Sequence, residues 1–129
     1  MRVGLLIVAA LALIGFIAVA VVLPEMAGAK SREAAAALIA GAEPGKQQVD
    51  RNVERSGKLL GAGNGVKIPP QQNQHGNLKW IVEDDGTIRG WNEQNALEIA
   101  VMPTLEGGKV NWRCKGYPVN SMPPTCGGR

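Results

Sequence analysis

The sequence contains few of the residues that carry out enzyme chemistry. Its 129 residues include one histidine and two cysteines. Acid–base or nucleophilic catalysis requires a reactive side chain beside a second group that activates it, and His75 lies in a polar stretch with no such partner in the sequence. Two cysteines and one histidine, far apart, also fall short of the roughly four ligands of a structural zinc site. We therefore expect no enzymatic activity, no metal and no cofactor.

The sequence also lacks the glycine-rich loops that bind nucleotides. Around Gly45 and Lys46, a phosphate-binding loop requires glycine where Ala40 stands and serine or threonine where Gln47 stands. The glycines within residues 61–65 have neither the preceding strand nor the following helix of a dinucleotide-binding fold. We interpret them as parts of a loop.

Charge of one sign is not concentrated anywhere. The 14 basic and 11 acidic residues give a formal charge of +3, and they alternate along stretches such as residues 50–58, which is typical of a solvated surface. A nucleic-acid footprint requires basic residues clustered on one face. The only hint of such a cluster is Arg113, Lys115 and Arg129 near the C-terminus, so DNA is a weakly supported partner.

A long apolar run begins the sequence. Residues 3–23 contain no charged, amide, hydroxyl or proline side chain, and a helix that rises about 1.5 Å per residue would carry them across a hydrocarbon core roughly 30 Å thick. Arg2 precedes the run and Glu25 follows it, which places the N-terminus in the cytoplasm. We predict that residues 1–26 form a membrane anchor in contact with lipid, and that residues 27–129 form an exported domain.

A removable signal peptide is the alternative interpretation of the same segment. Arg2 supplies a charged start, Pro24 breaks the helix, and the small residues 27–29 precede Lys30 as a signal peptidase site requires. The apolar run is longer than the roughly 7 to 15 residues usual in a signal peptide. Both interpretations remain open.

The next segment is rich in helix formers. We predict a helix over residues 27–60 that continues the first one, kinked at Pro24, kinked or broken again near residues 41–45, and ended by Gly61. Residues 61–77 contain Gly and Pro breakers and polar residues, and they are predicted to be a loop.

The remainder has the alternation of β-strands. About four antiparallel strands are expected at residues 78–82, 87–91, 97–102 and 109–114, with turns at Asp84-Asp85-Gly86 and at residues 106–108. One sheet face is apolar, and the amphipathic helix is its expected cover. The predicted fold class is therefore α+β: a long, membrane-spanning N-terminal helix packed on a roughly four-stranded antiparallel sheet, with a C-terminal disulfide-closed loop.

The two cysteines are predicted to form a disulfide. Their number is even, an exported domain stands where disulfides persist, and Cys114 and Cys126 enclose eleven residues. The bridge would fasten an irregular tail to the last strand. The resulting rigid surface loop would offer Arg113, Lys115, Tyr117 and Asn120 for contacts.

This order of parts resembles the type IV pilins of bacteria. The resemblance rests on the apolar start, on Pro24 just after it, and above all on a set of C-terminal stretches: Asp85-Gly86-Thr87-Ile88, Leu97 to Leu105, Gly108-Lys109-Val110-Asn111-Trp112-Arg113-Cys114 and Pro123-Pro124-Thr125-Cys126. It implies a long helix packed in a filament core, a sheet that faces outward, and a disulfide loop, here between Cys114 and Cys126, on the subunit surface.

The sequence departs from the pilin pattern near its N-terminus. Pilins usually have a glutamate at the fifth mature position, which neutralises the terminal amine of a neighbouring subunit. Cleavage after Gly4 places Ala9 there, and counting back from Pro24 places Ile7 there. An unpaired amine in an apolar filament core is costly. Neither assignment supplies the carboxylate.

Two functions follow from the resemblance. The first is a structural subunit of a type IV pilus or related filament, assembled with copies of itself or other pilins through its apolar helix. Its displayed domain would serve adhesion, motility or DNA uptake, with a host surface or DNA as the partner. The second is a pilin-like binding module, anchored or secreted, that does not polymerise. The expected location is the inner membrane with the C-terminal domain in the periplasm, or an extracellular pilus.

Overall fold

The computed structural model describes residues 28–128, of which residues 31–128 belong to one compact unit. A helical segment at residues 28–41 is followed by a turn at Ala42. The further elements are α2 (Glu43–Ser56), β1 (Gln71–Asn73), β2 (Gly76–Val82), β3 (Ile88–Asn92), β4 (Leu97–Glu106), β5 (Lys109–Tyr117) and two short 3-10 helices, η1 (Val119–Ser121) and η2 (Pro124–Cys126).

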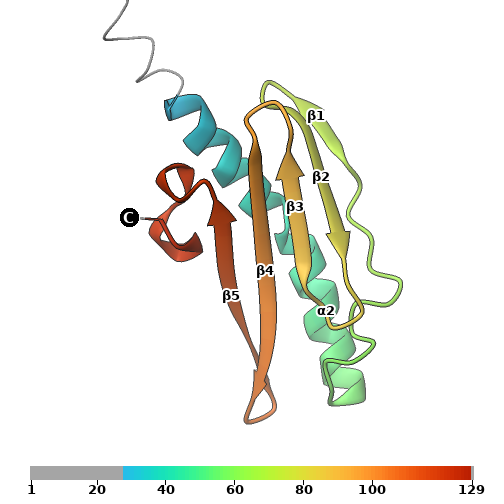
Figure 1. Cartoon of the computed structure of the whole chain (residues 1–129). Coiled ribbons are helices and arrows are strands. Elements are labelled where there is room, and N and C mark those ends of the chain that lie inside the picture. The colour runs from blue at the N-terminus through green and yellow to red at the C-terminus, as the bar shows by residue number, and fades with distance from the viewer. Residues whose placement is uncertain (1–27, 129) are drawn as a thin grey trace, which may run out of the picture. The chain divides into compact units, whose positions relative to one another are not determined.

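The strands form one antiparallel sheet in chain order, β1-β2-β3-β4-β5 (Figure 1). Each neighbouring pair is joined by a turn, so the sheet is a meander that needs no crossover connection. The register places Ile88 of β3 and Cys114 of β5 on either side of Val101 of β4. The β4–β5 hairpin is the longest, with nine residue pairs from Glu98–Tyr117 to Glu106–Lys109.

The helical residues cover one face of this sheet, behind the strands in Figure 1. Their buried positions recur every three or four residues, as one side of an α-helix requires: Ala34, Ala35, Leu38, Ala42, Gly45, Val49 and Val53. The opposing apolar residues occupy alternate strand positions: Leu78, Trp80, Ile88, Leu97, Ile99 and Val101. The core therefore lies in a single layer between helix and sheet.

The indole of Trp80 joins the two layers. The backbone N–H of Ala42 donates to the Ile39 carbonyl at 3.1 Å, three residues back, which frees the Leu38 carbonyl from its usual helical partner. Trp80 Nε1–H donates to that Leu38 carbonyl at 2.9 Å in a buried position. A Cβ at Gly41 would come within 2.2 Å of the Trp80 ring, so the close approach of helix and sheet requires glycine there.

Of the predicted break near residues 41–45, the structure shows a one-residue interruption at Ala42, which keeps helical backbone angles (φ −79°, ψ −17°), and α2 begins at Glu43. The helix ends earlier than predicted, at Ser56 rather than near Leu60. Gly57 adopts the left-handed conformation with φ of 73°, and its N–H donates to the Val53 carbonyl at 2.7 Å. This arrangement is a common helix end because glycine has no Cβ to strain.

The predicted fold class is wrong in two respects. The sheet has five strands rather than about four, since β1 lies inside the predicted loop at residues 61–77 and pairs with β2. Within residues 28–128, no helix is both long and apolar enough to cross a membrane. The apolar run at residues 3–23 and the predicted kink at Pro24 fall outside the described residues.

The C-terminal tail folds back onto β5. Cys114 and Cys126 form the predicted disulfide, and Cys126 is fully buried against the core. Gly116 of β5 makes room for Met122, whose sulfur would lie 2.2 Å from a Cβ at that position. The bridge and this contact hold η1 and η2 against β5. In Figure 1 the C-terminal coils lie beside that strand.

A second contact between helix and sheet can be tested by substitution. Trp112 Nε1–H donates to Asp50 Oδ1 at 3.0 Å, and the Trp112 ring centroid lies 5.8 Å from Lys46 Nζ. We expect Asp50→Ala to lower the free energy of unfolding by about 1 to 2 kcal/mol, because a part-buried donor loses a charged acceptor. Asp50→Asn keeps an acceptor and should cost less than half as much. Denaturant unfolding of the full chain in detergent, followed by tryptophan fluorescence, measures both; equal losses would contradict the role of the hydrogen bond.

Candidate functional site

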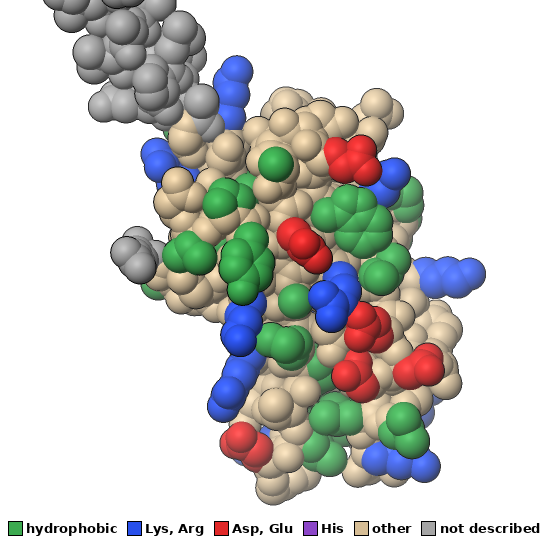
Figure 2. Space-filling view, in the orientation of Figure 1, with side chains coloured by type: hydrophobic (Ala, Val, Ile, Leu, Met, Phe, Trp, Pro, Cys, Tyr) green, Lys and Arg blue, Asp and Glu red, His purple; other side chains and the backbone are tan. Residues whose placement is uncertain are grey.

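The sheet face opposite the helix has no covering layer among the described residues (Figure 2). Strand alternation places every second residue on this outer face, and the register aligns them in rows across the strands. One row contains Lys79, Trp91, Glu98 and Tyr117, and the next contains Ile81, Arg89, Ala100 and Lys115. Tyr117 is 63% exposed and Ile81 is 49% exposed. Apolar and charged groups thus alternate over this outer face, which suits contact with another large molecule.

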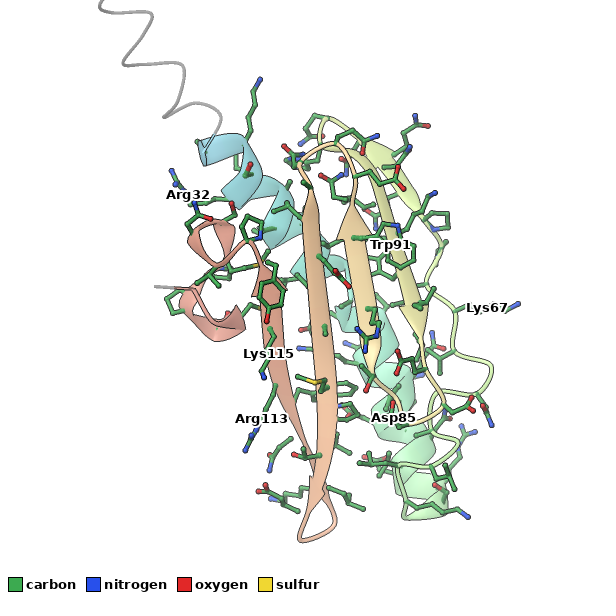
Figure 3. The ribbon with its side chains drawn as sticks, viewed as in Figure 1. Arg32, Lys67, Asp85, Trp91, Arg113 and Lys115 are labelled. Atoms are coloured by element: carbon green, nitrogen blue, oxygen red, sulfur yellow. A yellow bond between two sulfur atoms is a disulfide. The ribbon has the colours of Figure 1, made fainter. Side chains whose placement is uncertain are left out.

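Charges on this face are divided between its two sides. Arg113 and Lys115 are exposed on β5. Asp84 and Asp85 are exposed in the turn between β2 and β3, which we call the acidic turn. In Figure 3 the two basic side chains lie on one side of β4 and Asp85 on the other.

The acidic turn is held in a fixed conformation. Asp85 Oδ1 accepts a hydrogen bond from the Thr87 backbone N–H at 2.9 Å, and Gly86 adopts φ of 91°, where a Cβ would be strained. The Gly63 N–H also donates to the Asp84 carbonyl at 3.0 Å, which ties the preceding loop to the turn. The prediction of a hairpin turn at residues 84–86 is confirmed. Both carboxylates are therefore presented from a defined backbone.

Glu83, at the base of the turn, has an internal partner. It forms an ion pair with Arg89 Nε on the neighbouring strand. The hydrogen bond from Arg89 to Glu83, together with the negative charge of Glu83, raises the pKa of Arg89 above its ordinary value. The charge of Asp85 contributes to the same rise in the pKa of Arg89, so this cation lies within the electrostatic reach of the acidic turn. Among the described residues, neither Asp84 nor Asp85 forms an ion pair.

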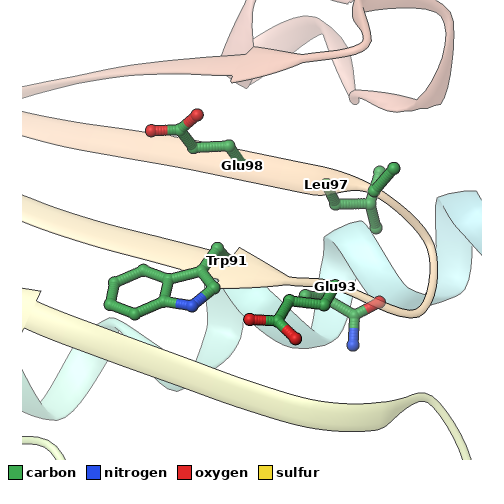
Figure 4. Close-up of a pocket in the computed structure, with 6 residues that line it drawn as sticks. Trp91, Glu93, Leu97 and Glu98 are labelled. Carbon is green, nitrogen blue, oxygen red and sulfur yellow. The ribbon is translucent and has the colours of Figure 1, made fainter.

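A shallow hollow of about 440 Å³ lies beside Trp91 (Figure 4). Glu93, Leu97 and Glu98 also line it, and its two carboxylates are exposed. Asn92, which is fully buried, contributes to the lining but is already engaged, because its Nδ2 donates to the His75 and Asn77 carbonyls at 2.9 Å each. Its Oδ1 accepts from the backbone N–H and the side chain of Asn95. The hollow has no buried polar group free to bind or activate a small substrate.

The structure brings most of the predicted contact residues to one surface. Arg113, Lys115 and Tyr117 alternate along β5 on the outer face, and Asn120 is exposed in η1 of the disulfide loop. His75 lies at the β1–β2 turn with no acidic or thiol partner, and the residues from 28 to 128 contain no cluster of three potential metal ligands. The role of the four surface residues stays a prediction.

Sequence reasoning missed the part of the surface that lies on the other strands. Lys79, Trp91 and Glu98 fall within the predicted strands, but no contact role was predicted for them. Strand alternation could have identified them, because residues that alternate with the buried apolar positions lie on the sheet face that the helix does not cover. No family model matches the chain, and neither the curated proteins nor the solved structures contain a significant match.

Proposed function

We propose that this chain is a structural subunit of a type IV pilus or a related filament. It assembles through the apolar run at residues 3–23, which contacts membrane lipid before assembly and other subunits afterwards. It displays the described domain for adhesion, motility or DNA uptake. Before assembly it is held at the inner membrane with this domain in the periplasm. The proposal combines the sequence resemblance with the architecture of the domain.

One observation carries most of the proposal. A helix lies on one face of a meander sheet, and a tail joined to the last strand by the Cys114–Cys126 disulfide closes its C-terminal end. The pilin resemblance implies this combination of a helix-backed sheet with a disulfide loop at the surface. The described residues also present an uncovered sheet face with exposed apolar and charged side chains, which suits a subunit that acts through contacts.

The test is the composition of filaments sheared from the source cells. We expect mass spectrometry to find this chain in the filament fraction, with the Cys114–Cys126 bridge intact. Ile14→Arg, which places a charge in the apolar run, should remove the chain from filaments without changing the disulfide or the fluorescence of the domain. Leu60→Arg is the matched control, because Leu60 is 74% exposed and its substitution should leave incorporation unchanged. Filaments that lack the wild-type chain would overturn the proposal.

A second candidate is a pilin-like binding module that does not polymerise. It is favoured by Ala9 or Ile7 at the position where pilins have glutamate, and by the small residues 27–29 before Lys30, where a signal peptidase could release the domain. Sequencing the mature N-terminus separates the candidates. A start at Lys30 supports a released module, whereas a start upstream of it rules release out.

A further inference from the structure

β5 is an edge strand of the sheet. It pairs with β4 on one side, and the part of the chain that the structure describes places no strand on its other side (Figure 1). A two-residue turn at residues 107–108, with φ of 57° and 80°, joins it to β4. Such a turn is closed by a hydrogen-bonded pair, and the pairs beyond it then alternate between bonded and non-bonded. Val110 and Trp112 therefore occupy non-bonded positions, and Pro103, opposite Trp112, has no N–H to donate.

The backbone groups of Val110 and Trp112 consequently point away from the sheet. No backbone hydrogen bond among residues 28–128 engages their N–H or C=O groups on this side. The open edge begins at Lys109 and extends to Cys114, where the disulfide attaches the tail. An unpaired strand edge of this kind can accept the backbone of an added strand.

The outer side of this edge is basic. Lys109, Arg113 and Lys115 are exposed there. The β4 residues opposite Arg113 and Lys115 are Met102 and Ala100, and the ion pairs found among the described residues include neither cation. In Figure 3 the side chains of Arg113 and Lys115 extend from β5 away from β4. Acidic side chains on the outer side of an added strand would therefore be stabilised by cross-strand pairing.

The inner side of the same edge has a different character. Val110 and Trp112 are half-buried there, and Trp112 Nε1–H donates to Asp50 of α2 at 3.0 Å. A hollow of about 290 Å³ lies between α2 and the start of β5, and it is lined by Asp50, Val53, Glu54, Gly108, Lys109 and Val110. The two carboxylates would repel an acidic side chain. Small apolar side chains fit the inner positions of an added strand best.

Two other occupants match this edge less well. Antiparallel pairing of two β5 strands about Trp112 would place Lys109 of each copy opposite Lys115 of the other, and like charges directly opposite are destabilising. The β1 edge of a second copy, Gln71–Asn73, has no carboxylate. Nucleic acid would be attracted to the cations, but its closely spaced phosphates would meet Glu106 beside Lys109 and the carboxylates of the hollow.

We propose that the free edge of β5 binds an extended segment of a different protein, with acidic side chains at alternate positions and small apolar side chains between them. The segment adds an antiparallel strand to the sheet, in the orientation of every other strand pair. Its backbone bonds to Val110 and Trp112, and its acidic side chains meet Lys109, Arg113 and Lys115. This inference does not depend on the filament function.

A synthetic peptide tests the edge directly. The probe is Glu-Val-Glu-Val-Glu-Val-Glu with blocked ends, titrated at low salt into ¹⁵N-labelled full chain in detergent and followed by NMR. We expect saturable shifts of the β5 amide signals. Hydrogen exchange at Val110 and Trp112 should slow about tenfold at roughly nine-tenths occupancy, because only the free fraction of the chain then exchanges.

Backbone methylation of the peptide separates strand addition from simple charge attraction. N-methylation of the central valine removes an N–H that faces β5 and should weaken binding by about tenfold. N-methylation of a neighbouring glutamate, whose N–H faces solvent, is the matched control and should weaken binding by less than about threefold. Equal losses from the two methylations would overturn the inference.

Variants of the chain test the charge pattern. R113E/K115E should weaken binding of the acidic peptide by about tenfold, and it should bind Lys-Val-Lys-Val-Lys-Val-Lys more tightly than the wild type does. R51E/R55E reverses two exposed charges on α2 and should leave peptide binding unchanged.

Three further results would contradict the proposal. The first is the absence of exchange protection at Val110 and Trp112. The second is equal binding of Glu-Glu-Glu-Glu-Val-Val-Val, which has the same composition without the alternation. The third is an oligonucleotide that displaces the peptide and loses affinity in R113E/K115E without protecting the two amides, which would assign the cations to nucleic acid.

Discussion

Trp80→Ala is expected to lower the free energy of unfolding by about 3 to 5 kcal/mol, the range usual for a tryptophan removed from a core. Trp80 is 6% exposed, and its indole N–H satisfies the Leu38 carbonyl that the helix break at Ala42 leaves free. The substitution therefore creates a cavity and leaves a buried carbonyl without a donor. Denaturant unfolding of the full chain in detergent, followed by far-UV circular dichroism, measures the loss.

Trp91→Ala is the matched control for this prediction. It removes the same ring from the half-buried outer face, and we expect a loss of less than about 1 kcal/mol. Gly41→Ala supplies an independent check, since its Cβ would clash with the Trp80 ring. Gly41→Ala should destabilise the wild type but should be tolerated in the Trp80→Ala background. Additive effects of the two substitutions would contradict the packing described above.

The sequence was most informative where local pattern and tertiary burial agree. Four strands were placed within a few residues because their apolar positions alternate and all face one helix, as Leu97, Ile99 and Val101 do. The turn at residues 84–86 was recognisable because aspartate and glycine favour its backbone conformation. The disulfide followed from the number of cysteines, and the structure contains it.

The errors arose where that agreement is absent. β1 consists of Gln71, Gln72 and Asn73, all exposed, so it has no buried face to produce alternation, and backbone pairing to β2 defines it. The helix was extended to Leu60 because leucine fits the apolar spacing, but Leu60 is exposed and the left-handed Gly57 ends the helix first. For locating the end of a helix, a single apolar side chain at helical spacing is therefore weaker evidence than a glycine that can adopt the left-handed conformation.

The candidate surface was only half visible from the sequence. Arg113, Lys115 and Tyr117 could be selected because they flank the disulfide. The acidic turn was recognised as a turn, but its position against Val49 of α2 and Pro103 of β4 depends on helix packing and on strand register, which the alternation pattern does not fix. The separation of charges across β4 therefore emerges only when the strands are aligned.

Replacing both cysteines, as C114A/C126A, is expected to lower the free energy of unfolding by about 3 kcal/mol. The bridge joins residues 12 positions apart, and opening it returns freedom to the unfolded chain, while Cys126 also loses its place in the core. The retained packing of Met122 on Gly116 should keep the strand itself folded. Chemical denaturation of the full chain in detergent measures the change.

Reduction distinguishes the bridge from the side chains that form it. Wild-type chain in a thiol reductant should lose nearly the same stability as the variant, whereas the variant itself should not respond. Proteolysis should then cut the tail near the exposed residues Val119 and Asn120 first, because the bridge no longer fastens this loop to β5. If the reduced tail remains resistant to proteolysis while the free energy of unfolding falls, the disulfide stabilises the protein only by restricting the unfolded chain. The surface that carries Tyr117 and Asn120 would then keep its conformation without the bridge.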